Sequence, residues 1–337
     1  MTPYHMTCPI QCSKARFAVA VVREAAQLVR RVQREMVGAA LSKDDKSPVT
    51  VADFAAQALV GKRLLESFPA MGFVGEESSD SLRTAEGRET LRQITHFVRL
   101  SFPEATDDDV CQWIDRGAGD PTENFWTLDP VDGTKGFLRG DQYAVALAYV
   151  RDGIVRVGAL GCPELADGMR PDKGGSGSLL VARRTNGTYV CSLDDIEYQW
   201  RPLKVSSTTD VADARLLRSV EKAHTDTGGI GELVAALGIT ADPVSMDSQA
   251  KYAVLAAGGG DVNLRLLSPS RPDYREKIWD QAAGTIVVEE AGGRVSDLDG
   301  KPLNFSQGRT LAANRGVLAT NGLLHDALLT GLKQICV

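Results

Sequence analysis

Residues 125–137 read FWTLDPVDGTKGF, and the rest of the chain is organised around this stretch. Its apolar start is typical of a buried strand, so the carboxylates of Asp129 and Asp132 emerge where the strand ends and the backbone turns. Pro130 favours an extended conformation for Asp129, while Gly133 permits backbone angles and close approaches that a side chain would block. Asp129 and Asp132 can therefore face one point.

Two carboxylates that converge on one point repel each other unless a positive charge lies between them. A hard divalent cation with oxygen ligands is the usual partner of such a pair. The same letters also fit an ordinary turn built from Asp and Gly, so the stretch alone leaves both interpretations open.

The composition is that of a globular protein with a large core or two lobes. The chain has 337 residues, of which 43% are hydrophobic and 24% charged, which excludes disordered and collagen-like classes. A net charge of −6 without a Lys/Arg-rich run argues against binding to a nucleic acid polymer. The six cysteines are scattered without a pair of CxxC motifs, so we expect free thiols in a reducing cytosol.

The chain carries no sequence signal for secretion or for a membrane. No basic segment is followed by an apolar one near the N-terminus, and no run approaches the ~18 apolar residues of a membrane span. We therefore expect a cytoplasmic protein that does not bind a membrane. A monomer and a homodimer both remain open.

Hydrophobic spacing predicts a mixed α/β chain. Apolar residues recur at helical spacing over residues 15–40, and strand-like runs joined by turns fill residues 143–192. Short strands then alternate with helices, which predicts an N-terminal α+β lobe over residues 1–200 and a C-terminal α/β lobe over residues 201–337. The polar segment at about 80–123 is predicted to be an insertion that could cover the site as a lid.

Two further acidic motifs stand apart from the central stretch. A short apolar strand runs into Glu76 and Glu77, of which one should face the site because successive side chains of an extended chain alternate in direction. Asp280 opens a predicted helix, where the helix dipole alone would favour a carboxylate. Asp53, three residues after Thr50, fits a capping box as well as it fits a catalytic role.

Three motifs follow one another along the chain and together resemble a known family. They are Gly75-Glu76-Glu77-Ser78, Asp129-Pro130-Val131-Asp132-Gly133-Thr134, and Trp279-Asp280 followed by Ala282-Ala283-Gly284 and Glu290-Ala291-Gly292-Gly293. In this order they resemble the metal-dependent, lithium-sensitive phosphomonoesterases, which include inositol monophosphatase, fructose 1,6-bisphosphatase and 3′(2′),5′-bisphosphate nucleotidase. The resemblance spans essentially the whole chain. It implies a layered α/β fold, a sandwich of alternating helix and sheet layers in two lobes.

The resemblance also implies a magnesium site with two or three Mg²⁺ ions and inhibition by Li⁺. Glu76, Asp129 and the carbonyl of Val131 would hold one ion. A second would be held by Asp129, Asp132 and Asp280. Two cations about 3.5–4 Å apart can bind the phosphoryl oxygens, lower the pKa of a bound water and neutralise the departing alkoxide.

The remaining roles come from the same resemblance. Asp53 and Thr134 would hydrogen-bond the attacking water, with Asp53 orienting the Thr134 hydroxyl. The backbone N–H groups of Gly133 and Thr134 would contact the phosphate. No covalent phosphoenzyme is needed.

The long segment between Glu77 and Asp129 resembles the bisphosphate nucleotidases more than the inositol monophosphatases. Runs at 219–224 and 246–252 are similar to the segments with which those enzymes hold the nucleotide. The residues that would contact the nucleotide or its second phosphate are His224, Ser248, Lys251 and Arg265. Cations remote from the metals suit a second phosphate, although Lys251 and Arg265 could also be solvated surface charges and His224 an exposed polar residue.

The expected activity is hydrolysis of the 3′-phosphate of adenosine 3′,5′-bisphosphate, so the expected partner is a small phosphorylated molecule. Two alternatives remain open from sequence. One is a phosphatase that acts on inositol phosphates with the same metals. The other is a non-catalytic sensor that binds phosphoadenosine compounds.

Overall fold

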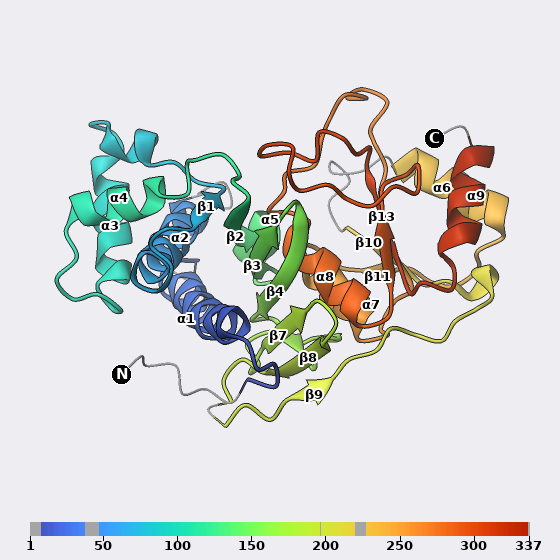
Figure 1. Cartoon of the computed structure of the whole chain (residues 1–337), viewed down its shortest axis with the longest axis horizontal. Helices are drawn as coiled ribbons and strands as arrows, with labels where there is room; N and C mark the ends of the chain where they lie inside the picture. Colours follow the sequence, from blue (N-terminus) through green and yellow to red (C-terminus); the bar gives the residue numbers. More distant parts are fainter. Residues whose placement is uncertain (1–7, 38–46, 196, 220–226, 336–337) are drawn as a thin grey trace.

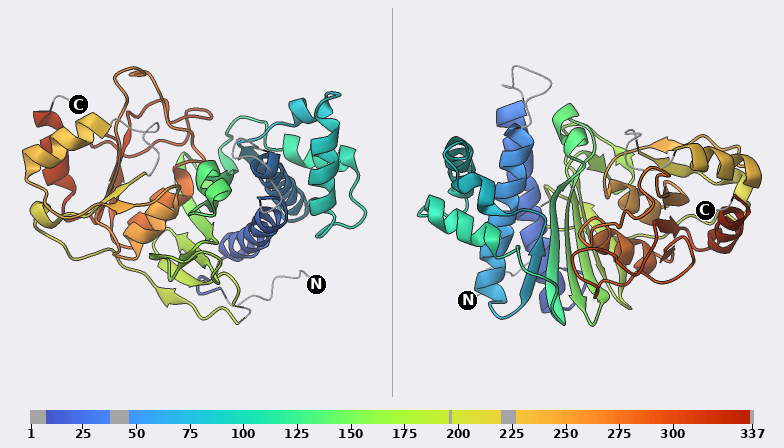
Figure 2. Two further views of the ribbon diagram at one scale, coloured as in Figure 1. Left: turned by 180° about the vertical axis from the view of Figure 1, so that it is seen from behind. Right: turned by 90° about the horizontal axis from the view of Figure 1, so that it is seen from above.

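The computed structural model describes residues 8–37, 47–195, 197–219 and 227–335. This part of the chain stacks in five layers, in the order helix, sheet, helix, sheet and helix (Figure 1, Figure 2). The alternating layers confirm the predicted fold class. Within the described residues, no helix combines the length and the apolar character that crossing a membrane requires.

The first layer consists of two long helices that pack against each other and against one face of the first sheet. Helix α1 (Ser13–Met36) confirms the first predicted helix, and residues 38–40 of the predicted range lie outside the described residues. Helix α2 (Ser47–Ser67) is buried on most sides because it lies between α1, the sheet and two shorter helices.

The first sheet alternates its side chains between two helix layers. Val145, Leu147 and Tyr149 belong to the core shared with α1 and α2, whereas Ala144 and Ala146 belong to the core on the opposite face. Within the described chain the strand order is β1-β2-β3-β4-β7-β8-β9, and the strands predicted over residues 143–192 are confirmed. The bounds are β1 (Gly72–Gly75), β2 (Asn124–Asp132), β3 (Ala144–Arg151), β4 (Ile154–Cys162), β7 (Ser178–Arg183), β8 (Gly187–Ser192) and β9 (Arg201–Pro202), with a small hairpin of β5 (Leu165–Ala166) and β6 (Arg170–Pro171).

The middle layer belongs to the second half of the chain and covers the other face of the first sheet. It consists of α7 (Ala250–Ala256) and α8 (Ala282–Glu290). Gly158 on β4 allows the close approach of α8, because a Cβ there would come within 2.5 Å of the Ile286 Cγ2 atom. The two halves of the chain therefore share this helix layer.

The second sheet and the last helix layer follow. The sheet has the order β11-β10-β12-β14-β13, and helices α6 (Thr227–Leu237) and α9 (His325–Gln334) pack against each other on its outer side (Figure 1). The first sheet ends with β9 and the second begins with β10, so we keep a lobe boundary near residue 200 as a proposal. The strand bounds are β10 (Leu216–Arg218), β11 (Val244–Ser245), β12 (Val262–Arg265), β13 (Arg294–Ser296) and β14 (Val317–Thr320), after a 3-10 turn η3 (Val211–Asp213).

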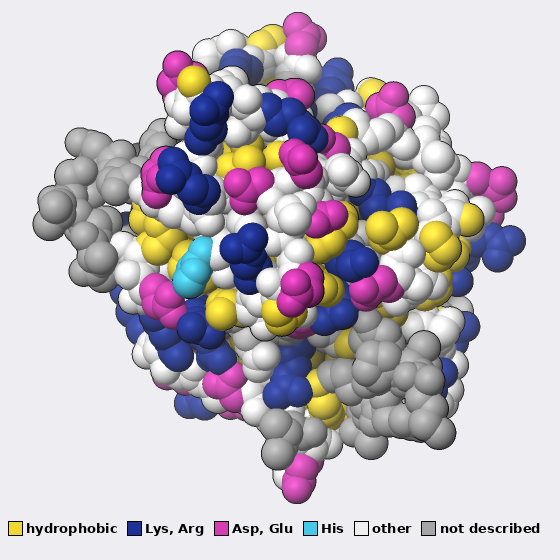
Figure 3. Space-filling model, turned by 90° about the vertical axis from the view of Figure 1, so that its left-hand side faces the viewer, with side chains coloured by type: hydrophobic (Ala, Val, Ile, Leu, Met, Phe, Trp, Pro, Cys, Tyr) yellow, Lys and Arg dark blue, Asp and Glu magenta, His cyan; other side chains and the backbone are white. Residues whose placement is uncertain are grey.

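The predicted insertion packs on α2 and does not cover the site. It forms η2 (Ser79–Arg83), α3 (Arg88–Val98) and α4 (Asp107–Asp115), whose apolar side chains join the core around α1 and α2. No residue between 79 and 123 lines the pocket described below, so the expectation of a lid is wrong. The outward side of the molecule at this end carries interspersed basic and acidic side chains (Figure 3).

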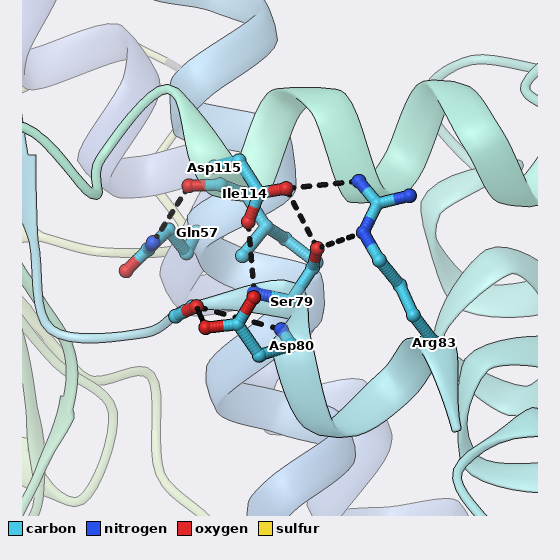
Figure 4. A network of polar contacts seen from close by, with 7 residues as sticks. Gln57, Ser79, Asp80, Arg83, Ile114 and Asp115 are labelled. Carbon is cyan, nitrogen blue, oxygen red and sulfur yellow. Dashed lines mark hydrogen bonds and ion pairs between the residues drawn. The ribbon is translucent and has the colours of Figure 1, made fainter.

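The turn that follows β1 is held by two side chains, one from α2 and one from α4 (Figure 4). The Gln57 Nε2 atom donates to the carbonyl oxygens of Glu77 (2.7 Å) and Ile114 (3.0 Å), and its Oε1 atom accepts the Glu77 N–H (3.0 Å). The carboxylate of Asp115 accepts both the N–H (2.8 Å) and the hydroxyl (2.7 Å) of Ser79. The insertion thus helps to hold the turn after β1, which carries Glu76 and Glu77 and is called the acidic turn below.

Replacement of the completely buried Gln57 by methionine should destabilise the protein. The variant Gln57→Met keeps a similar volume but leaves one N–H and two carbonyl groups without these partners, so we expect a loss of about 2–3 kcal/mol in the free energy of unfolding. Urea denaturation monitored by circular dichroism measures this loss. Gln112→Met, at an exposed position of α4, is the matched control and should change stability by less than ~0.5 kcal/mol. Equal losses in the two variants would contradict the assignment.

Candidate active site

The end of β2 brings both central aspartates to one pocket. In a regular strand, residues three apart point to opposite faces, but the pairing of β2 with β3 shifts register between Asp129 and Asp132. Three residues of β2 therefore span the distance of two residues of β3. Asp129 and Asp132 consequently line the same pocket, which has a volume of about 400 Å³.

The turn after Asp132 requires glycine on two counts. Gly133 has a φ of +94°, in the region that disfavours side chains, and a Cβ there would stand 2.8 Å from the Ser248 Cβ atom. Ser248 itself has a φ of +65°. Thr134 follows as the first residue of the short helix α5 (Thr134–Arg139), where it is exposed and lines the pocket.

The pocket gathers residues from both halves of the chain. The predicted site residues in its lining are Glu76, Asp129, Val131, Asp132, Gly133, Thr134, Ser248, Lys251, Arg265 and Asp280. Among the other residues in its lining are Ser219, Gln249, Asn263, Tyr274, Lys277 and Gln281. The sequence analysis gave none of them a role of its own, although Ser219 and Gln249 lie in the runs that resemble nucleotide-binding segments. His224 lies outside the described residues.

The four carboxylates predicted to bind metal carry a high electrostatic cost. Burial, followed by the charges of Glu76 and Asp132, raises the pKa of Asp129 well above its ordinary value. Burial and the nearby Asp132 do the same to the pKa of Asp280. Glu76 reaches solvent at the pocket, yet lost hydration in the cleft and the charges of Glu77 and Asp132 raise its pKa to about 7.

These side chains fit a hard divalent cation in their chemistry. All are oxygen ligands, and the buried Oδ1 atom of Asp129 has no hydrogen-bond partner. Within the described ranges, however, no three His, Cys, Asp or Glu side chains are already arranged to hold a metal ion. Because free carboxylates repel one another, rotation of these side chains would be needed to form a ligand shell, and the ligand assignment remains a proposal.

Asp53 is not a helix cap. Helix α2 already includes Ser47, so Thr50 and Asp53 both lie inside the helix and the capping-box interpretation is wrong. The Asp53 side chain is buried, and its Oδ1 atom has no hydrogen-bond partner. Burial, then Glu77 and Glu76, raises its pKa well above the ordinary value. Asp53 therefore lies near Glu76 and Glu77, and no hydrogen bond to its Oδ1 atom explains why this carboxylate is buried.

Asp280 precedes its helix by two residues. Helix α8 begins at Ala282, and its N-cap residue Gln281 makes no capping hydrogen bond with its side chain. The prediction that Asp280 opens the helix is thus displaced by half a turn. Because Asp280 lies before the first turn of α8, its carboxylate can face the pocket.

Lys251 and Arg265 are the less exposed cations of the pocket, whose lining also includes the exposed Lys135 and Lys277. The Lys251 Nζ atom donates to the Ser219 Oγ atom at 2.8 Å, and the Arg265 guanidinium lies 3.5 Å from the Glu276 carboxylate. Burial, followed by the charge of Arg265, lowers the pKa of Lys251 to about 8. Lys251 is buried and the Arg265 side chain is 20% exposed, so neither is the solvated surface charge that the sequence left open.

Buried glutamines connect the site and were missed from sequence. The Gln249 N–H donates to the Asp132 carboxylate at 2.7 Å, and its side chain donates to the Trp279 carbonyl (3.0 Å) and accepts the Gly284 N–H (3.1 Å). Gln249 thus joins the ends of β2, α7 and α8. A signal did exist for Gln57, since a single amide inside the apolar run of residues 54–60 needs a buried partner.

Comparison with known proteins identifies relatives along the whole chain. The model of the inositol monophosphatase family matches residues 11–335. The chain is 41% identical over 325 residues to a 3′(2′),5′-bisphosphate nucleotidase of Schizosaccharomyces pombe, with 91% of each chain covered. It is 40% identical over 327 residues to a protein of the same name from Oryza sativa, with 92% of this chain and 90% of that one covered.

Solved structures share the fold at low identity. The inositol monophosphatase from Anabaena superposes with a TM-score of 0.60 and 22% identity over 96% of this chain and 97% of that one. The inositol monophosphatase from Zymomonas mobilis gives a TM-score of 0.62 with 20% identity over 95% and 97%. Because the family model matches residues 11–335, nearly the whole chain, the chain belongs to the inositol monophosphatase family.

Proposed function

We propose that the chain is a Mg²⁺-dependent phosphomonoesterase that hydrolyses the 3′-phosphate of adenosine 3′,5′-bisphosphate to AMP and phosphate. The observation that carries the proposal is a single pocket with carboxylates from both halves of the chain, the buried Lys251 and the partly buried Arg265. A substrate with two phosphates suits a pocket that has an acidic part for metals and a cationic part for a second phosphate. The names of the relatives at about 40% identity support the choice of substrate.

The acidic part of the pocket would bind the metals. We assign Glu76, Asp129 and the carbonyl of Val131 to one Mg²⁺, and Asp129, Asp132 and Asp280 to a second. The proposal allows for a third Mg²⁺. Bound magnesium would polarise the phosphoryl group and lower the pKa of a water molecule. The raised pKa values of these acids support the assignment, since a cation would offset the repulsion that raises them.

The chain's own groups would orient the reactants. Asp53 accepts a proton from the Thr134 hydroxyl, whose oxygen in turn takes the proton of the attacking water. The backbone N–H groups of Gly133 and Thr134 donate to the phosphate oxygens. The water oxygen bonds to phosphorus as the bond to the 3′ oxygen breaks. That oxygen takes a proton from solvent as AMP leaves, and Asp53 returns its proton to solvent.

The cationic part of the pocket would hold the second phosphate. Lys251 and Arg265 offer charge-assisted hydrogen bonds to the 5′-phosphate, and Ser248 adds a hydroxyl. His224 completes the set that we assign to the nucleotide. Sensitivity to Li⁺ and a cytoplasmic location belong to the same proposal, the latter supported by the five cysteines of the described residues, all of which are free thiols.

A phosphate-release assay tests the substrate. Adenosine 3′,5′-bisphosphate should be hydrolysed far faster than inositol 1-phosphate, with activity that requires Mg²⁺ and falls on addition of Li⁺. The opposite ranking would assign the protein to the inositol phosphatases. Tight binding of the bisphosphate without phosphate release would instead identify a sensor.

Removal of one carboxylate should abolish turnover without unfolding the protein. We expect Asp132→Asn or Asp280→Asn to lower kcat on the order of 100-fold or more, because the lost charge is needed only for the metals and the transition state. Thermal unfolding should change little, since burial already disfavours the charge of Asp280. Asp299→Asn, in a surface ion pair with Arg315, is the control and should keep full activity. Full turnover by Asp280→Asn would show that the assignment is wrong.

Deprotonation of Lys251 should give the pH profile of kcat/KM a basic limb, that is, a fall in activity at high pH. Its pKa is lowered to about 8, so the ammonium is present below that pH and lost above it. The kcat/KM for adenosine 3′,5′-bisphosphate should therefore fall as the pH rises through about 8, since this constant reports the free enzyme. Lys251→Met should be slower at neutral pH and lack that limb. The limb should also be absent with adenosine 3′-monophosphate, and its persistence in Lys251→Met would refute the role.

A further inference from the structure

Arg309 is attached to the segment that carries Asp280. Its carbonyl oxygen accepts the N–H of Ile278 at 3.2 Å, and the next residue, Thr310, forms an antiparallel bridge with Lys277. Its guanidinium lies over the Trp279 ring at 4.8 Å from the centroid. Arg309 is thus fixed, by backbone and by side chain, to the residues directly before Asp280.

The same guanidinium reaches the segment that carries Glu76. Its Nη2 atom donates to the Gly75 carbonyl at 2.5 Å, and its Nη1 atom donates to the carbonyls of Gly117 (3.1 Å) and Gly119 (2.9 Å). These partners lie 190 to 234 residues away in the sequence and belong to the first half of the chain. Gly75 immediately precedes Glu76, and its own N–H donates to the Gly117 carbonyl at 2.8 Å.

The arrangement of these contacts distinguishes Arg309 from the other supports of the acidic turn. Gln57 and Asp115 hold the turn from within the first half of the chain. Arg309 instead spans from that turn to the Asp280 segment with a planar fork of donors, which the single ammonium of lysine cannot reproduce. Glu76 and Asp280 are assigned to two neighbouring Mg²⁺ ions that share Asp129, so a working pair of metal sites requires the separation of Glu76 and Asp280 to be fixed within about 0.5 Å.

We propose that Arg309 is a positioning residue that sets the separation of Glu76 and Asp280, and thereby the affinity of the site for divalent metal. The inference rests on the proposed function, because it assumes that both carboxylates bind metal. It assigns Arg309 no contact with the substrate. Loss of the fork should therefore weaken metal binding and leave the binding of the nucleotide nearly unchanged.

Direct measurement of metal binding tests this role. Mn²⁺, which prefers the same oxygen ligands as Mg²⁺, is titrated into wild type, Arg309→Lys and Arg309→Gln, and the free ion is followed by electron paramagnetic resonance. We expect the Kd for Mn²⁺ to rise about 10-fold or more in both variants. The Mg²⁺ concentration for half-maximal activity should rise in parallel, while KM for the bisphosphate at saturating Mg²⁺ stays close to that of wild type.

Arg294→Lys is the matched control, since Arg294 also lies in the second half of the chain but pairs with Asp326 at the surface. It should bind Mn²⁺ as wild type does. Unfolding in the presence of EDTA shows whether each variant is folded without metal. If Arg309→Gln does not fold, the Mn²⁺ affinity of Arg309→Lys decides the test. Wild-type affinity in a folded Arg309 variant, or failure of both variants to fold, would overturn the positioning role and leave the proposed function intact. Absence of Mn²⁺ binding by the wild type would overturn both.

Discussion

Repulsion among carboxylates that converge on one pocket is the constraint on which the rest of this structure depends. Two unit charges about 4 Å apart repel by about 4 kcal/mol at the effective dielectric constant of a protein surface. The pocket holds Glu76, Asp129, Asp132 and Asp280, delivered by three segments that are far apart in the sequence. A chain that left these segments loosely attached would relax by moving the acids apart. The scaffold must therefore oppose that force from several directions.

The supports are hydrogen bonds to backbone, made by side chains from neighbouring elements. Gln57 holds the turn after β1, Gln249 connects the end of β2 to α8, and Arg309 connects the two outer acidic segments. The shared layer of α7 and α8 adds a packed floor, because alanines on β3 and Gly158 on β4 let the helices lie close to the first sheet. The site is thus held in place by the hydrogen bonds and the packed helix layer that connect the two halves of the chain.

Sequence alone could predict what local pattern encodes. A strand-like run that starts at Tyr143 identified β3, and the acidic motifs identified residues that do share a pocket. Patterns failed where the outcome depends on a distant partner. The apolar face of the segment after residue 80 did not reveal that it would pack on α2, and Thr50 with Asp53 imitated a cap inside a helix. Nothing near Arg309 in the sequence indicates three carbonyl partners about 200 residues away.

The contact between Gly133 and Ser248 has a consequence for motion. Each residue has a positive φ, and no side chain fits between them. The two halves of the chain meet there, within the pocket itself, and Gln249 adds a hydrogen bond to Asp132 beside it. Separation of the two halves at this point would break the Gly133–Ser248 contact and the hydrogen bond between Gln249 and Asp132.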